Sequence, residues 1–177
     1  MIRLTLMLTL LAFPARADEP SLDQMLGALR VAPDEQTAGQ LEKEIKARWQ
    51  AAASPAVKLL LSRAMRELGE NAPGDAVDSF DAALDLSPDL LEAWRGRALA
   101  RAQMGDAAGA VRDLQEAVRR EPRDFAAFQE LSHIAESRGD LEGAILAWRK
   151  VLELDPKSPQ GAGRMRTLQR LRLGQGA

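Results

Sequence analysis

The stretch FAAFQELSHIAESRGDLEGAILAWRKVLELDP, residues 125–156, contains two amphipathic segments that are separated by Gly139 and Asp140 and ended by Pro156. Pro88 and Pro122 end similar segments, so the three prolines are each 34 residues apart. A fixed period of this length is typical of a stacked repeat. Because proline cannot extend a helix and disfavours helical geometry in the preceding residue, each proline turns the chain at the same place in its repeat.

Aligning the chain on these prolines gives three blocks, 57–90, 91–124 and 125–158, in which large and small residues recur together. The small ones are Ala64, Ala98 and Ser132, then Ala76, Ala110 and Ala144, and the large ones are Phe80, Leu114 and Trp148. Small residues let two antiparallel helices approach closely, so each block is predicted to be a helical hairpin. Glycine permits the left-handed turn, and the following aspartate caps the second helix; the first block has Asn71 and Ala72 there instead.

This arrangement of bulky, small and proline residues resembles the tetratricopeptide repeat family, over about 100 of the 177 residues. The resemblance implies an all-α fold, a right-handed α-α superhelix of three helical hairpins. Arg97 and Arg101 stand where the family usually has a leucine and a tyrosine, and Arg63 and Glu67 stand at those places in the first block.

The flanking segments are predicted to be helical caps. Residues 18–54 carry two amphipathic patterns, Leu22, Met25, Leu26 and Leu29, then Leu41, Ile45 and Trp49, and indicate an N-terminal capping hairpin or a degenerate repeat. Residues 159–177 carry a stripe that predicts a capping helix over the last repeat, made of Ala162, Met165, Leu168 and Leu171. This end of the chain also carries five basic residues: Lys157, Arg164, Arg166, Arg170 and Arg172. They could bind an acidic partner or anionic lipid, but we favour a helix face that is exposed to solvent.

The amino-acid composition argues against several classes of function. The residues are mostly helix formers, and 24 basic against 26 acidic residues argue against nucleic-acid binding. With no cysteine and the single histidine His133, most metal and triad chemistries are excluded, and neither a cofactor nor enzyme activity is expected. His133 shares a helix face with Gln129 and Glu136, which suggests a contact residue more than a catalytic base.

Residues 1–17 read as a signal peptide. Arg3 precedes an apolar run of ten residues from Leu4, and Ala15-Arg16-Ala17 predicts cleavage between Ala17 and Asp18. The run is too short for a membrane span, which takes about 20 residues. An exported, periplasmic protein without a stable membrane span after processing is therefore expected.

The resemblance also implies a function, since in this family the first helices of the repeats line a concave surface that holds a peptide or protein segment. The implied lining here is Lys58, Leu61, Met65, Glu92, Arg95, Leu99, Gln103, Gln129, His133 and Glu136. One subclass grips a C-terminal carboxylate with basic and amide side chains, and none occupies those places here, which hold Leu61, Met65, Gly96, Ala126 and Glu130. We expect a protein-binding scaffold of unknown partner; the alternative is an accessory subunit of an envelope enzyme or assembly complex, as in cytochrome maturation or cell-wall synthesis.

Overall fold

The computed structural model describes residues 19–51, 53–159 and 161–175, and in these residues it contains nine helices and no strand. The helices are α1 (Leu22–Arg30), α2 (Glu35–Ala51), α3 (Pro55–Gly69), α4 (Pro73–Leu86), α5 (Leu91–Gln103), α6 (Ala107–Arg120), α7 (Phe125–Ser137), α8 (Leu141–Leu154) and α9 (Gly161–Gln175).

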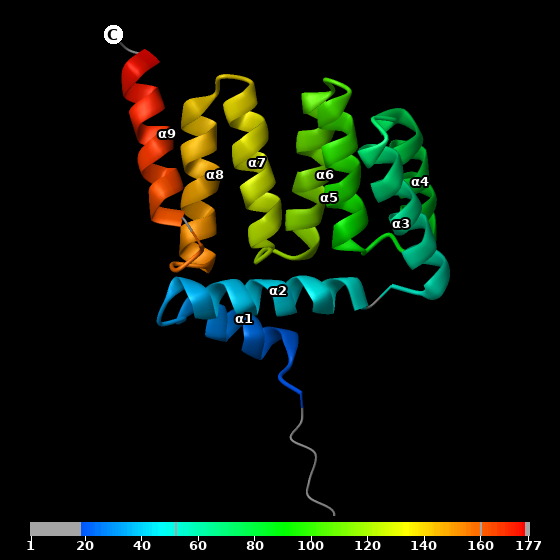
Figure 1. Cartoon of the computed structure of the whole chain (residues 1–177), viewed down its shortest axis with the longest axis horizontal. Coiled ribbons are helices and arrows are strands. Elements are labelled where there is room, and N and C mark those ends of the chain that lie inside the picture. Colours follow the sequence, from blue (N-terminus) through cyan, green and yellow to red (C-terminus); the bar gives the residue numbers. More distant parts are fainter. Residues whose placement is uncertain (1–18, 52, 160, 176–177) are drawn as a thin grey trace, which may run out of the picture.

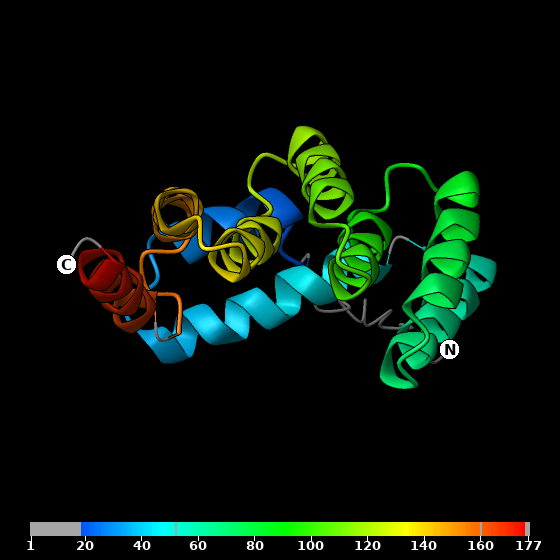
Figure 2. The same cartoon turned by 90° about the horizontal axis from the view of Figure 1, so that it is seen from above.

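The three predicted hairpins are present as α3–α4, α5–α6 and α7–α8, and they stack side by side with their axes roughly upright in Figure 1. Seen from above in Figure 2, α5 and α7 lie on one side of the stack, and α6 and α8 lie on the other. The all-α superhelix expected from the repeat is therefore confirmed.

The turns inside the hairpins have the predicted chemistry. Gly105 and Gly139 have φ of 83° and 76°, and Asn71, at the same place in the first repeat, has φ of 59°. In the second and third repeats an aspartate then caps the next helix, because Asp106 accepts from the Gly109 N–H and Asp140 accepts from the Gly143 N–H, each at 2.8 Å. Left-handed backbone geometry is what favours glycine and asparagine here.

The small residues are also where close helix packing requires them. Ala98 and Ala110 are fully buried between α5 and α6. At the same place in the third repeat, the Ser132 hydroxyl donates to the Ala144 carbonyl at 2.9 Å. The hydroxyl thereby satisfies its hydrogen-bonding capacity inside the core, so serine can replace alanine there.

The two arginines that depart from the family pattern have a partner. Arg97 and Arg101 of α5 both bind the buried Asp113 of α6, with shortest distances of 2.8 Å and 2.7 Å, and Arg97 also reaches Asp81 of α4. In the first repeat the corresponding Glu67 binds Arg63 and Ser79, each at 2.7 Å. The third repeat has apolar residues at the three corresponding places: Leu131, Ala135 and Ala147.

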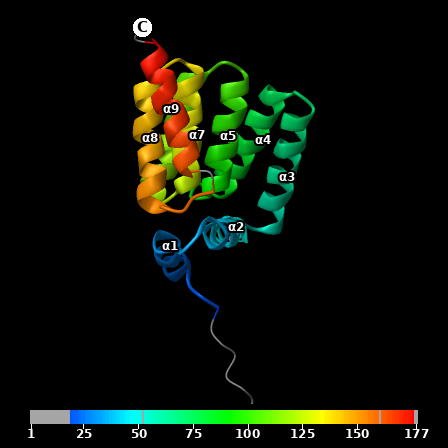
Figure 3. The same ribbon diagram turned by 60° about the vertical axis from the view of Figure 1, so that its left-hand side comes forward.

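The N-terminal hairpin does not continue the stack of repeats. Its second helix, α2, runs across the lower ends of the repeat helices, with α1 beneath it (Figures 1 and 3). We call α1 and α2, residues 22–51, the brace. Its position follows from its apolar residues, because Ile45 and Trp49 share one core with Leu91 of α5 and Phe125 of α7.

Both ends of α2 hold the brace in place. Near its C-terminus, the Trp49 ring lies 5.6 Å from the Phe125 ring, and the Arg95 guanidinium lies 5.3 Å from the Trp49 ring. Nearer its N-terminus, Glu42 accepts from the Ser158 hydroxyl at 3.1 Å. The fully buried Asp155 lies beside Glu42, and burial together with this second carboxyl raises the pKa of Asp155 to about 7. These two carboxyls lie where the brace meets the α8–α9 connection.

Helix α9 covers α8, as expected of a capping helix, although the buried stripe is shorter than predicted. Leu168 is fully buried against Ala144 and Ile145, while Ala162 and Leu171 are exposed. Of its basic residues, Arg166, Arg170 and Arg172 are exposed, whereas Arg164 is half-buried and binds Glu136; Arg172 also binds Glu142.

Candidate functional site

A pocket between α5 and α7 brings together three of the residues predicted to line the groove. It has a volume of about 290 Å³, and its predicted members are Leu99, Gln103 and His133. Leu99 is 44% exposed although it is apolar, and Gln103 and His133 are exposed beside it. We call this cavity the open pocket; its other lining residues are Ala102, Glu130, Ile134 and Ser137.

Two predicted groove residues are buried, and for them the prediction was wrong. Leu61 belongs to the core that joins α3, α4 and α5, because it continues the apolar stripe of Val57 and Ala64. Arg95 is 8% exposed, and its Nη1 donates to both oxygens of Asp124 at 2.7 Å. Asp124 is fully buried and caps α7 by accepting from the Ala127 N–H, so Arg95 holds two helices together and offers nothing to a ligand.

The remaining predicted residues lie outside the open pocket. Lys58 and Met65 are exposed on α3, and Gln129 is half-buried on α7. Glu92 accepts from the Gln50 amide of the brace at 2.9 Å, and burial raises its pKa. Glu136 binds Arg164 of α9. The brace and the capping helix therefore engage two side chains that the repeat pattern alone assigns to the groove.

Sequence reasoning noted Glu130 only as a departure from a carboxylate-binding pattern, yet Glu130 lines the open pocket. Its Oε2 is shielded from solvent and has no hydrogen-bond partner among the described residues. Burial raises the pKa of Glu130 to about 7. Glu130 could have been found from the sequence because residues four positions apart share a helix face, and Ile134 lies on the face of α7 that lines the pocket.

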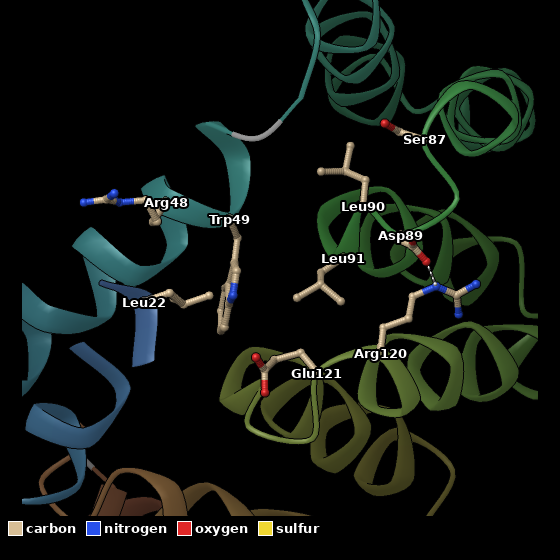
Figure 4. Close-up of a pocket in the computed structure, with 9 residues that line it drawn as sticks. All are labelled: Leu22, Arg48, Trp49, Ser87, Asp89, Leu90, Leu91, Arg120 and Glu121. Carbon is tan, nitrogen blue, oxygen red and sulfur yellow. Dashed lines mark ion pairs between the residues drawn. The ribbon is translucent and has the colours of Figure 1, made fainter. Parts of the chain in front are cut away.

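A larger cavity of about 610 Å³ lies between the brace and the connections that join the repeats (Figure 4). Its charged walls are already paired: Arg120 lies 3.4 Å from Asp89, and Glu121 binds Arg123 at 2.9 Å. The cavity is thus a gap between the brace and the stack, edged by ion pairs, and we place the candidate site in the open pocket.

In residues 19–51, 53–159 and 161–175, three or more histidine, cysteine or acidic side chains nowhere gather in a way that could hold a metal ion. Over the same residues, no helix has the length and apolar character that crossing a membrane requires. The predicted signal peptide and its cleavage site between Ala17 and Asp18 lie outside the described residues.

The sequence matches no family model. It is 28% identical to a TPR repeat-containing protein of Rhizobium etli, a match that covers 88% of this chain and 84% of the relative. It is 29% identical to small glutamine-rich tetratricopeptide repeat-containing protein 2 of Mycosarcoma maydis, covering 48% of this chain but only 24% of the relative.

Solved structures share the fold. The first TPR of Spaghetti (RPAP3), bound to an HSP90 peptide, has a TM-score of 0.61 at 20% identity, covering 67% of this chain and 97% of that chain. The Yersinia enterocolitica type III secretion chaperone SycD, in complex with a peptide of the translocator YopD, has a TM-score of 0.61 at 17% identity, covering 70% and 97%. The 34-residue period, the stacked hairpins and these comparisons show that the chain has the fold of a tetratricopeptide repeat domain.

Proposed function

We propose that this protein is an exported, non-enzymatic peptide-binding module, and that the open pocket holds a short segment of a partner protein. The observation that carries the proposal is the exposure of Leu99 inside a concave, mostly apolar pocket between the first helices of two successive repeats. Apolar concave sites with a few polar groups are typical of ligand binding.

The neighbouring residues support this choice. Gln103 and His133 can donate and accept hydrogen bonds at the rim of the pocket, as the backbone of a bound peptide requires. The RPAP3 and SycD structures, which share this fold, each contain a bound peptide. Export is supported by the apolar start of the chain and Ala15-Arg16-Ala17. Determining the N-terminal residue of the mature protein tests export, since Asp18 is expected and Met1 would contradict it.

Peptide selection tests the binding function. A displayed library of random 12-residue peptides is selected against the full chain, and the enriched peptides are measured by isothermal titration calorimetry. We expect binding that Leu99→Asp weakens at least about tenfold, because a charge replaces an apolar contact in the pocket.

The matched control is Leu146→Asp. Leu146 lies on α8 and is 57% exposed, so the same substitution occurs at a similar exposure outside the open pocket. The Leu146→Asp variant should bind the selected peptides with the same affinity as the wild type. If no peptide is enriched, or if both substitutions have the same effect, the proposed site is wrong.

A further inference from the structure

Among the described residues that line the open pocket, Glu130 has a buried carboxyl oxygen, Oε2, without a hydrogen-bond partner. It lies on α7 next to the apolar side chains of Leu99 and Ile134, and none of the hydrogen bonds between described residues involves it. A buried acceptor without a donor costs free energy, and the cost is larger for a charged group. A ligand that donates a hydrogen bond to Glu130 would therefore remove this cost and bind more tightly.

The cations nearest to Glu130 are already engaged. Arg95 donates to both oxygens of Asp124 at 2.7 Å. Lys46 of the brace binds Glu42 at 3.2 Å and lies 5.1 Å from the Phe125 ring. Their charges act on Glu130 only through space: Arg95 and Lys46 lower its pKa, and Asp124 raises it. No described residue donates to Glu130 in the structure, so a bound ligand can supply the donor.

The shape and lining of the pocket indicate what kind of donor fits. Its volume of about 290 Å³ lies at the small end of ligand pockets, which suits a single long side chain. Leu99, Ala102 and Ile134 offer an apolar wall along which an aliphatic stem can lie, and Glu130 belongs to the same lining. Arginine and lysine combine such a stem with a cationic donor, and arginine can engage both carboxyl oxygens.

We propose that the open pocket binds an arginine or lysine side chain of the partner segment, with its stem against Leu99 and its cationic group on Glu130. This rests on the proposed peptide-binding function and specifies which class of segment the site takes. An acidic or purely apolar segment would leave the carboxyl without a donor.

The test uses the full chain and the same 12-residue peptide library, selected in parallel against the wild type, Glu130→Gln and Glu92→Gln. Glu92 is a matched control, because its Oε2 is also buried without a partner, yet it lies outside the open pocket and is held by Gln50. Enrichment of arginine or lysine is expected at one peptide position, beside an apolar residue. The enrichment should disappear with Glu130→Gln and persist with Glu92→Gln.

One enriched peptide is then synthesised with arginine or norleucine at the enriched position. On the wild type the norleucine peptide should bind about tenfold or more weakly, while on Glu130→Gln the two peptides should bind almost equally. Peptides that need Leu99 but show no preference for a cation would overturn this inference and leave the proposed function standing. An equal loss of affinity with norleucine on the wild type and on Glu130→Gln would overturn it in the same way. If no peptide binds in a Leu99-dependent way, the proposed function itself fails.

Discussion

The two halves of α5 and of α7 differ in what their side chains contact, although they are only about one helical turn apart. On α5, Arg95 is buried next to the brace and paired with Asp124. Leu99, four residues later, is 44% exposed in the open pocket. On α7, Phe125 packs against Trp49 of the brace, while Glu130 and His133 face the pocket. We call the first region the braced half and the second the open half.

The difference arises because α2 crosses only the lower ends of the repeats (Figure 1). Where α2 covers the repeat helices, Arg95 is paired with Asp124, and the Trp49 ring packs against the Phe125 ring. Beyond α2, an apolar side chain and an unpartnered carboxyl remain. Substitutions in the braced half should therefore change the stability of the fold, and those in the open half should change binding.

The largest effect is expected for Arg95→Leu in the braced half. It leaves Asp124 buried without its cation, and breaking a buried ion pair by removing one partner typically costs about 3–5 kcal/mol. Urea unfolding followed by circular dichroism measures the free energy of unfolding. Leu99→Asp, one turn along the same helix, is the comparison and should change that free energy by less than about 0.5 kcal/mol. Equal losses in the two variants would remove the distinction between the halves.

The second expected effect is a pH dependence of peptide binding in the open half. Binding of a cationic side chain requires ionised Glu130, whose pKa is raised to about 7 by burial, so affinity should rise about tenfold between pH 6 and pH 8. The charged groups facing it are Arg95 of α5, Lys46 of α2 and Asp124, and His133 lies in the same pocket.

Because a histidine can also change charge near neutral pH, this titration is performed on His133→Gln. Calorimetry at each pH gives the affinity of one selected peptide. Adding Glu130→Gln should abolish the pH dependence; a slope that survives this second substitution would assign the effect to another group.

A smaller effect on stability is expected from the carboxyl pair that holds the brace. The pKa of Asp155 is raised from 3.8 to about 7 in the folded state, so between these values the folded protein binds more protons than the unfolded chain. This contribution to stability is present below about pH 4 and is lost as the pH rises to about 7.

Asp155→Asn keeps an acceptor for the Lys157 N–H, held at 3.2 Å, and supplies an amide donor for Glu42. The variant should be at least about 1 kcal/mol more stable than the wild type at pH 8, with a smaller difference at pH 5. Urea unfolding at the two pH values measures it. A variant that is less stable than the wild type at pH 8 would show that the Asp155 carboxylate does not destabilise the fold at that pH.

The smallest effect is expected for Met65→Gln. Met65 is 51% exposed on α3 and lies outside the open pocket, although the repeat pattern assigns it to the groove. Neither the free energy of unfolding nor the affinity of a selected peptide should change beyond measurement error. A loss of affinity comparable to that of Leu99→Asp would extend the site onto the first repeat.

The repeat itself could be predicted from the sequence because its features are local. The left-handed turns at Gly105 and Gly139 and the aspartate caps depend only on neighbouring residues. The place of the brace could not be predicted in this way. It depends on contacts between residues far apart, such as Trp49 with Phe125, which no repeat period encodes.

The same limit explains the errors in the candidate site. The repeat pattern gives the face of a helix on which Arg95 lies, but the pairing with Asp124 across 29 residues determines that it is buried. Conversely, Arg97 and Arg101 signalled a buried partner, since two arginines in place of apolar residues require an acid; Asp113 of the adjoining helix supplies it.

Methyl NMR tests the central claim, that a peptide binds in the open half and not under the brace. Two isoleucines report on the two halves, because Ile134 lines the open pocket and Ile45 is fully buried in the brace. On titration of a selected arginine-containing peptide into the full chain, we predict chemical-shift changes at the methyl groups of Ile134 and Leu99 and none at Ile45. Changes at Ile45 with Ile134 and Leu99 unperturbed would contradict the account.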